Sequence, residues 1–230
     1  MDIKQIKGKL FKEATIFKTG GFRPTEELGE SWIGKVLWGT EQENIPSQFD
    51  PIFTLFLNDL PYCPEEIKHY QLITISLNFA VFDHLVDPDL SPFFKINCYT
   101  SLEELQKINA QSTLISPFPL TAEYIKNDTP SWDSGFIETD LEDEIIRLEE
   151  DDGQSDFNYY DDIVEEMYSI HKVGGYPSFS QSGVSFGDDY PFVFQISSDY
   201  KAQFNIVDDG NFYFFYNKEK DDWIVYCDFY

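Results

Sequence analysis

Positive charge is scarce in this sequence. Sixteen lysine and arginine residues stand against 42 aspartate and glutamate residues, which gives a net charge of −26 and a pI near 4.1. Nucleic acids and anionic membrane surfaces are therefore poor ligands, because their binding depends on Lys and Arg side chains. A basic protein is the favoured partner, since opposite net charges speed encounter. Acidity that serves only solubility is the alternative.

Cysteines and long apolar runs are also few. The three cysteines, Cys63, Cys98 and Cys227, have no CxxC spacing, so we expect reduced core residues. No apolar run approaches the roughly 18 to 20 residues of a membrane helix. The N-terminal segment 1–9 has lysines but no apolar signal-peptide core. These features predict a cytoplasmic protein that does not enter a membrane.

Motifs for catalysis or metal binding are missing. His69, His84 and His171 lie far apart in the sequence, and neither a phosphate-binding glycine loop nor a GxSxG nucleophile elbow occurs. Segments 151–156 and 208–211 place oxygen ligands about a glycine, but both lack the spacing and closing glutamate of a calcium-binding EF-hand. We expect solvated turns there, and no catalytic site, metal or cofactor.

Aromatic residues are abundant. They make up 17% of the 230 residues, with 22 Phe and 14 Tyr, and favour strands around an aromatic core. Trp32 and Trp38 lie in a short strand flanked by glycines and are placed either for burial or for the wall of a pocket. Tyr176 is the third candidate for such a wall.

Alternation of apolar and polar residues predicts most of the secondary structure. Strands are expected at 32–39, 49–61, 72–79, 93–99, 191–196, 202–206, 211–216 and 223–230. The last four of these are expected to form an antiparallel meander. Residues 2–16 fit either a helix or the approach to a strand. Ser101–Glu104 has the order of a helix-capping box, which predicts a short helix. Segment 117–130 is rich in proline and predicts an irregular connection.

Two glycine pairs organise the chain. Gly20 and Gly21 are followed by Pro24, and Gly174 and Gly175 are followed by Tyr176 and Pro177. Each pair permits backbone angles closed to other residues and predicts a turn into a strand. The repeated motif of a glycine pair followed by proline suggests an internal duplication. We expect one α+β, β-rich domain over 1–230, with antiparallel sheets in two related, intimately packed halves and a few short helices. The halves would be 1–116 and 131–230, joined by 117–130.

Half of the net charge lies in one segment. Residues 138–166 hold fourteen acidic side chains against Arg147 alone. Apolar residues at helical spacing predict an amphipathic helix over 141–150 and a second over 161–169. The candidate partner-binding surface consists of Glu142, Asp143, Glu149, Glu150, Asp151 and Asp152. A solvated helix face is the alternative.

A succession of motifs resembles the YwqG-like family of bacterial proteins. The second half carries them as Lys172–Pro177, Gln181, Phe194–Asp199 with Gln195, and the aromatic run Phe212–Tyr216. The first half matches more loosely, at Gly20–Pro24, Ile52–Pro61 and Leu72–Phe79. Where the family often has Trp-Gly-Asp before the last aromatic strand, this chain has Ile206–Gly210, which puts any ligand held by that tryptophan in doubt.

The resemblance implies a duplicated β-rich fold with no established enzymatic activity, in a family considered a source of candidate immunity proteins. We therefore expect a non-enzymatic cytoplasmic binding protein, and specifically an immunity protein that neutralises a basic toxin domain through its acidic surface. The alternative is a small-ligand or peptide binder with an aromatic pocket between the halves, walled by Trp32, Trp38 and Tyr176.

Overall fold

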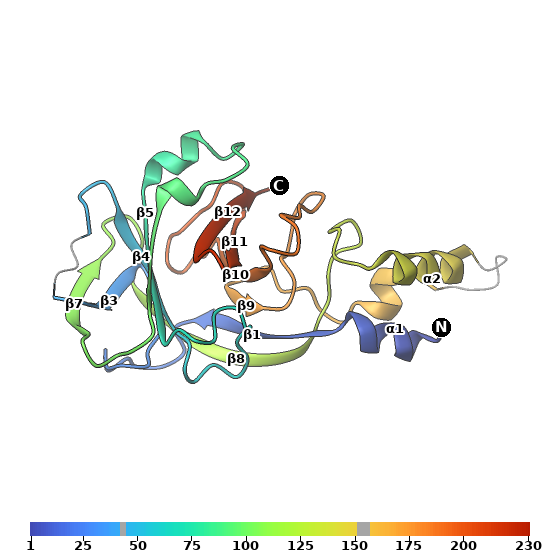
Figure 1. Cartoon of the computed structure of the whole chain (residues 1–230), viewed down its shortest axis with the longest axis horizontal. Helices are drawn as coiled ribbons and strands as arrows, with labels where there is room; N and C mark the ends of the chain where they lie inside the picture. The colour runs from blue at the N-terminus through green and yellow to red at the C-terminus, as the bar shows by residue number, and fades with distance from the viewer. Residues whose placement is uncertain (42–44, 151–156) are drawn as a thin grey trace.

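A long, curled antiparallel sheet forms the body of the protein in the computed structural model, which describes residues 1–41, 45–150 and 157–230 (Figure 1). Its centre is the pair β1 (Lys12–Thr19) and β8 (Phe118–Asp128). Outward from β8 lie β2 (Trp32–Ile33), β4 (Asp50–Phe56), β5 (Leu72–Leu77) and β6 (Phe94–Tyr99). Outward from β1 lie β9 (Lys172–Gly174), β10 (Phe192–Ser197), β11 (Asn211–Asn217) and β12 (Asp222–Asp228).

The sheet curls so that its two flanks face each other across the main core. The Phe94 ring on β6 lies 5.0 Å and 5.4 Å from the rings of Phe212 and Phe214 on β11. The Leu90 N–H donates to the Val225 carbonyl, 2.7 Å away, near the open ends of the sheet. Two 3₁₀ turns, η1 (Phe79–Asp83) and η2 (Ser91–Phe93), lie between β5 and β6. Burial of these large rings supplies much of the driving force for folding.

A small second sheet leaves the body after β2. It pairs β3 (Lys35–Gly39) with β7 (Gln106–Gln111). Gly34 makes the change of direction with a φ of +72°, and a side chain there would meet the Ser116 carbonyl oxygen at 2.8 Å. Only glycine suits that backbone position.

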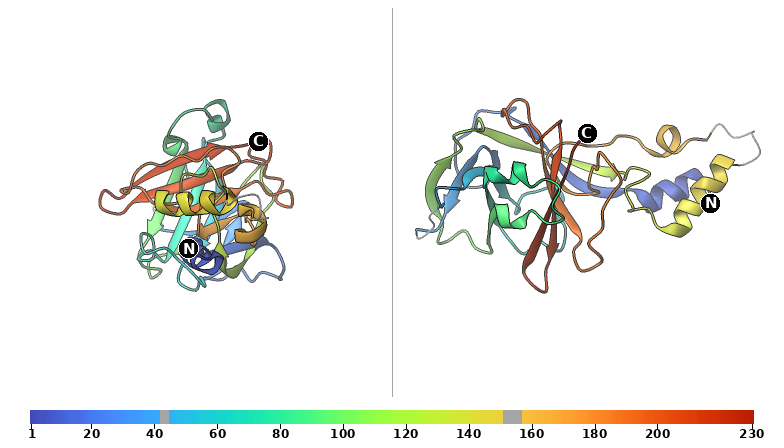
Figure 2. Two further views of the ribbon diagram at one scale, coloured as in Figure 1. Left: turned by 90° about the vertical axis from the view of Figure 1, so that its right-hand side faces the viewer. Right: turned by 90° about the horizontal axis from the view of Figure 1, so that it is seen from above.

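The helices form an arm that projects from one end of the sheet (Figures 1 and 2). It contains α1 (Ile3–Leu10), α2 (Thr139–Glu150) and the π-helical turn η3 (Tyr159–Ile163). Asp2 and Gln5 form a capping box at the start of α1. The arm has its own apolar core, made by Ile6, Leu10, Leu141, Ile145, Tyr159 and Ile163. It is therefore a distinct packing unit.

The β-rich antiparallel class, the C-terminal meander and the helix at 141–150 are confirmed. Segment 2–16 contains both of its alternatives, α1 followed by β1. The three cysteines are free thiols, and burial raises the pKa of each to about 12. Within the described ranges, every helix is too short or too polar to serve as a membrane span.

Four predictions of local structure are wrong. Segment 117–130 is not an irregular connection but contains β8. The Ser101 hydroxyl accepts the Glu103 N–H in a turn that leads into β7, so no helix starts there. Residues 202–206 make turns with one isolated bridge, since Gln203 has a φ of +58°. Of the second helix expected over 161–169, only the single turn η3 forms.

Candidate functional site

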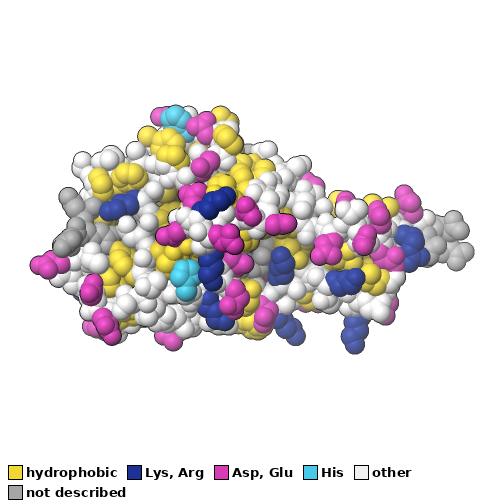
Figure 3. Space-filling view, in the orientation of Figure 1, with side chains coloured by type: hydrophobic (Ala, Val, Ile, Leu, Met, Phe, Trp, Pro, Cys, Tyr) yellow, Lys and Arg dark blue, Asp and Glu magenta, His cyan; other side chains and the backbone are white. Residues whose placement is uncertain are grey.

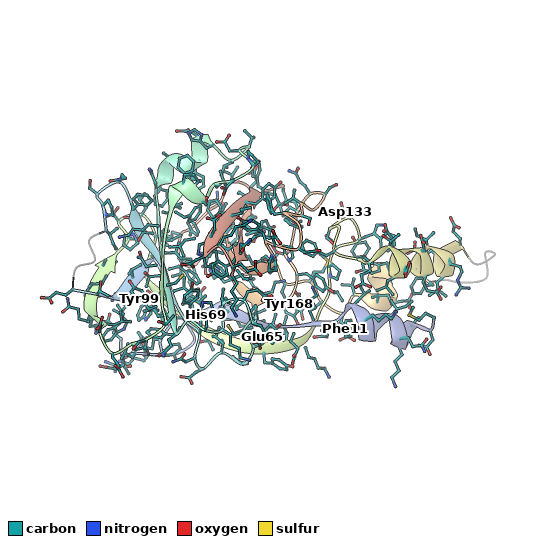
Figure 4. The ribbon with its side chains drawn as sticks, in the orientation of Figure 1. Phe11, Glu65, His69, Tyr99, Asp133 and Tyr168 are labelled. Atoms are coloured by element: carbon teal, nitrogen blue, oxygen red, sulfur yellow. The ribbon has the colours of Figure 1, made fainter. Side chains whose placement is uncertain are left out.

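Two adjoining depressions lie where the helical arm meets the sheet. Their volumes are about 400 Å³ and about 290 Å³, and they share Lys12, Phe136 and Glu138. We call the pair the junction groove. Phe11, the residue between α1 and Lys12, marks its position (Figure 4). The walls of the larger depression are aromatic, with Phe136, Phe186, Tyr190, Phe192 and Phe215.

The Lys12 side chain lies between the two depressions. Its ammonium is 4.2 Å from the centre of the Tyr176 ring, a cation–π contact. The Tyr176 hydroxyl donates to the Leu10 carbonyl at 2.8 Å, which fixes the ring against the end of α1. Desolvation lowers the pKa of Lys12, and the carboxylates of Asp128, Glu66 and Glu138 partly oppose this shift. The groove thus presents one ammonium against an aromatic wall.

A buried ion pair underlies this wall. Lys172 Nζ lies 2.8 Å from Asp128 Oδ2, and both side chains are 1% exposed. The same carboxylate oxygen accepts the Tyr176 N–H at 2.7 Å. Asp128 therefore holds both the strand β9 and the backbone of the wall residue.

The second glycine pair lets the chain pass this ion pair. Gly174 and Gly175 have φ values of +77° and +68°. A side chain at Gly174 would overlap the Tyr62 ring, and one at Gly175 would overlap the Asp128 carboxylate. The sequence predicts a turn into a strand at this pair, whereas in the structure Gly174 ends β9 and no strand follows before β10 at Phe192.

The first glycine pair has a different place in the strand order. Gly20 and Gly21 follow β1, whereas Gly174 ends β9. The Gly20 N–H donates to the Pro119 carbonyl at 2.7 Å, and the Thr121 hydroxyl donates to the Gly20 carbonyl at 2.6 Å. Pro24 lies in the loop between β1 and β2.

Two glutamines hold the chain after Pro177. The Gln195 amide donates to Ser178 Oγ at 2.7 Å and accepts the Ser178 N–H at 3.1 Å. The Gln181 amide donates to the Phe229 carbonyl at 2.8 Å, beside the last strand. Both glutamines are therefore structural supports, and neither belongs to the junction groove.

Asp228 anchors the same loop from β12. Its Oδ2 accepts the N–H groups of Ser180 and Gln181 at 2.9 Å and 3.2 Å, and its Oδ1 lies 2.7 Å from the Tyr213 hydroxyl. Burial raises the pKa of Asp228, and these hydrogen bonds oppose the shift.

A buried histidine on the other side of β9 resembles part of a catalytic triad but lacks the necessary order. The Ser197 N–H donates to His171 Nδ1 at 3.0 Å, so Nε2 carries the proton and faces Asp199 Oδ2 at 3.3 Å. The Thr19 hydroxyl donates to the same carboxylate and not to the imidazole. The imidazole is thus not placed to activate the Thr19 hydroxyl as it would be in a triad.

No group of three or more His, Cys, Asp and Glu side chains in the described part of the chain is arranged to hold a metal ion. Segment 208–211, considered for calcium, contains two residues with positive φ, Asp208 and Asp209, in the turn before β11.

Four of the six acidic surface candidates lie on α2, on the projecting arm (Figures 1 and 3). Asp143, Glu149 and Glu150 are exposed and Glu142 is half-buried. Asp151 and Asp152 lie outside the described residues. The neighbouring helix α1 carries Lys4, Lys7 and Lys9, so the arm has charges of both signs.

The three proposed pocket walls do not meet in one pocket. Trp32 lies on β2, on the β8 side of the main sheet, and Trp38 lies on β3 in the small second sheet. Tyr176 follows β9, on the β1 side of the main sheet. Trp32 is buried, with the Lys35 ammonium 5.0 Å from its ring. Only Tyr176 of the three lines the junction groove.

Sequence reasoning missed Lys12 and the phenylalanine walls. They come from segments near 12, 136, 186–192 and 215, which the fold brings together. The one available signal was a lysine at the boundary between the helical pattern and the first strand, which has no meaning until β1 is paired with β9.

Comparison with known proteins gives a family without a function. A family model described as a domain of unknown function, DUF1963, matches residues 62–222. No curated protein matches the chain.

Proposed function

The chain belongs to the family of the domain of unknown function DUF1963, and from that premise we propose that it is a non-enzymatic binding protein whose helix α2 docks a basic protein. The observation that carries the proposal is the row of exposed carboxylates on the projecting arm. Within the described part of the chain, Glu142, Asp143 and Glu150 form no ion pair, so their charges are available to a partner.

The location of these carboxylates supports a role in association. α2 packs through Leu141 and Ile145 onto the arm's own core, which leaves the opposite face to solvent. A net charge of −26 extends the attraction beyond α2. The partner class is a cationic protein, and a toxin domain neutralised in the cytoplasm is the specific case we propose.

A photo-crosslinking residue in place of Asp143 tests the surface. We expect it to capture a protein of net positive charge, and a matched residue in place of Val86, which is 91% exposed between η1 and η2, to capture none. Growth protection on co-expression with the captured protein would support the immunity role.

The kinetics of the captured pair provide the sharper criterion. Replacing Glu142, Asp143, Glu149 and Glu150 by lysine should slow association at low salt more than it changes dissociation. An unchanged association rate, or capture of an acidic partner, would refute the assignment of α2.

A second candidate function is the binding of a small ligand or peptide in the junction groove. The aromatic depression of about 400 Å³ favours it, because ligand sites are concave, mostly apolar and supplied with a few polar groups. Ser185→Trp, which would fill the larger depression, should abolish the binding of aromatic fragments detected by NMR. Unaltered binding in that variant would exclude the groove.

We also propose that the chain is an internally duplicated, YwqG-like member of bacterial origin. The strand order supports a duplication, because each member of the central β1–β8 pair is followed outward by one short strand and then three longer ones. These are β2, β4, β5 and β6 beside β8, and β9, β10, β11 and β12 beside β1. In that arrangement β2 corresponds to β9, and Gly34 to Gly174. An experimental structure whose β1–β6 cannot be superposed on β8–β12 would contradict it.

A further inference from the structure

Two lysines line the junction groove of this strongly acidic protein, together with two carboxylates, Glu138 and Asp188. Lys9 and Lys12 both line the smaller depression, and Lys12 also lines the larger one. Among the described residues, neither ammonium has an ion-pair or hydrogen-bond partner. Unpaired ammonium groups in a concave site are available to an anion.

Tyr176 holds the Lys12 ammonium without using its donors. The ring contributes a cation–π contact at 4.2 Å, which positions Nζ but leaves its three N–H groups unclaimed. Three supports fix the ring itself: its hydroxyl bond to Leu10, its N–H bond to Asp128 and the buried Asp128–Lys172 pair below. The donor is therefore presented by a preorganised wall.

The other lining residues of the junction groove determine which non-anionic part of a ligand would fit beside Lys12. Phe136, Phe192 and Phe215 line the larger depression beside Lys12, and the apolar Leu10 and Leu141 line the smaller one. Glu138, which lines both depressions, and Asp188, which lines the larger one, repel anions of high charge. A dianionic phosphate is disfavoured relative to a single carboxylate on an aromatic body.

We propose that the junction groove binds a monoanionic carboxylate attached to an aromatic group, with Lys12 as the carboxylate-binding residue. Lys9 strengthens the local potential. The inference rests on the second candidate function above and names its ligand chemistry. A free organic acid and the carboxyl end of a peptide can both supply this group.

The test compares acids with their neutral amides on the full chain. The probes are 4-phenylbutyrate against 4-phenylbutyramide, and an acetylated Gly-Gly-Phe peptide with a free carboxylate against the same peptide amide, measured by calorimetry and by NMR shifts. We expect at least one acid to bind about tenfold or more tightly than its amide, since a hydrogen bond to a charged group has that value. The acid that binds identifies the source of the carboxylate.

Lys12→Met should weaken acid binding about ten- to one-hundredfold and leave amide binding unchanged. Lys18→Met is the matched control on the same strand, since Lys18 is 61% exposed and paired with Glu123 away from the groove. Equal binding of acid and amide, or equal effects of the two variants, would overturn the carboxylate assignment while leaving a ligand groove. Failure of all four probes to bind would overturn both.

Discussion

Removing one partner of the buried pair Lys172–Asp128 should lower the free energy of unfolding by several kcal/mol. The two side chains are 1% exposed and 2.8 Å apart, and Asp128 also accepts the Tyr176 N–H. Lys172→Met leaves an uncompensated buried carboxylate, a change that costs about 3–5 kcal/mol in comparable pairs. With a urea m-value of about 2 kcal/mol/M, the unfolding midpoint should fall by about 2 M.

The chain supplies its own control and a double-mutant cycle. Lys18 on β1 and Glu123 on β8 form an exposed pair, so Lys18→Met should cost less than about 1 kcal/mol. Combining Lys172→Met with Asp128→Asn should cost less than the sum of the single changes, by about 2 kcal/mol or more. The assay is equilibrium urea unfolding monitored by circular dichroism. A Lys172→Met variant no less stable than Lys18→Met, or strict additivity in the cycle, would refute the reasoning.

Three further outcomes are expected. Gly174→Val should lower the free energy of unfolding by more than about 1–3 kcal/mol, because φ is +77° and the new side chain overlaps Tyr62. An unaltered urea unfolding midpoint together with loss of ligand binding would instead make Gly174 a site residue. Burial raises the pKa of Asp199, but its hydrogen bonds, including that from His171, outweigh burial and hold the pKa well below its usual range. The Asp199 carboxylate therefore stabilises the fold above the unfolded pKa of about 3.9, and this stabilisation is lost as the pH falls towards the folded pKa. Asp199→Asn should therefore flatten the acid limb of stability measured between pH 7 and pH 3, and an equally steep limb would contradict this. Deletion of 223–230 removes most of β12, which pairs with β11, and should abolish cooperative unfolding in a thermal melt; a soluble, cooperatively folded product would show that β12 is dispensable.

Local pattern was sufficient where a segment is a clear apolar run or has apolar residues at helical spacing. β5 and the β10–β12 meander are runs of apolar and aromatic residues bounded by turn residues, and α2 has apolar residues at helical spacing. In these segments, the local secondary-structure preference of the sequence agrees with the burial of its apolar side chains in the core.

Pattern failed where tertiary pairing decides the structure. Pro119 indicated a break, yet it is the second residue of β8, opposite Trp32, and its carbonyl accepts the Gly20 N–H. β7 is largely exposed and polar, and only its pairing with β3 makes it a strand. The junction groove could not be predicted for the same reason, because Lys12 and Tyr176 meet only through the β1–β9 pairing.

The exchange of strands at the centre of the sheet has a consequence for how the protein must be made. β2 pairs with β8, and β9 pairs with β1, so each flank is completed by the long strand that precedes the other flank. A ribosome has to deliver residues 118–128 before β2 gains its second neighbour, and residues 172–174 before β1 does. Until then the early strands present open edges that invite wrong pairing. The centre of the sheet therefore cannot close until residues 118–128 and 172–174 have been made, and a chain released before then would be an aggregation hazard.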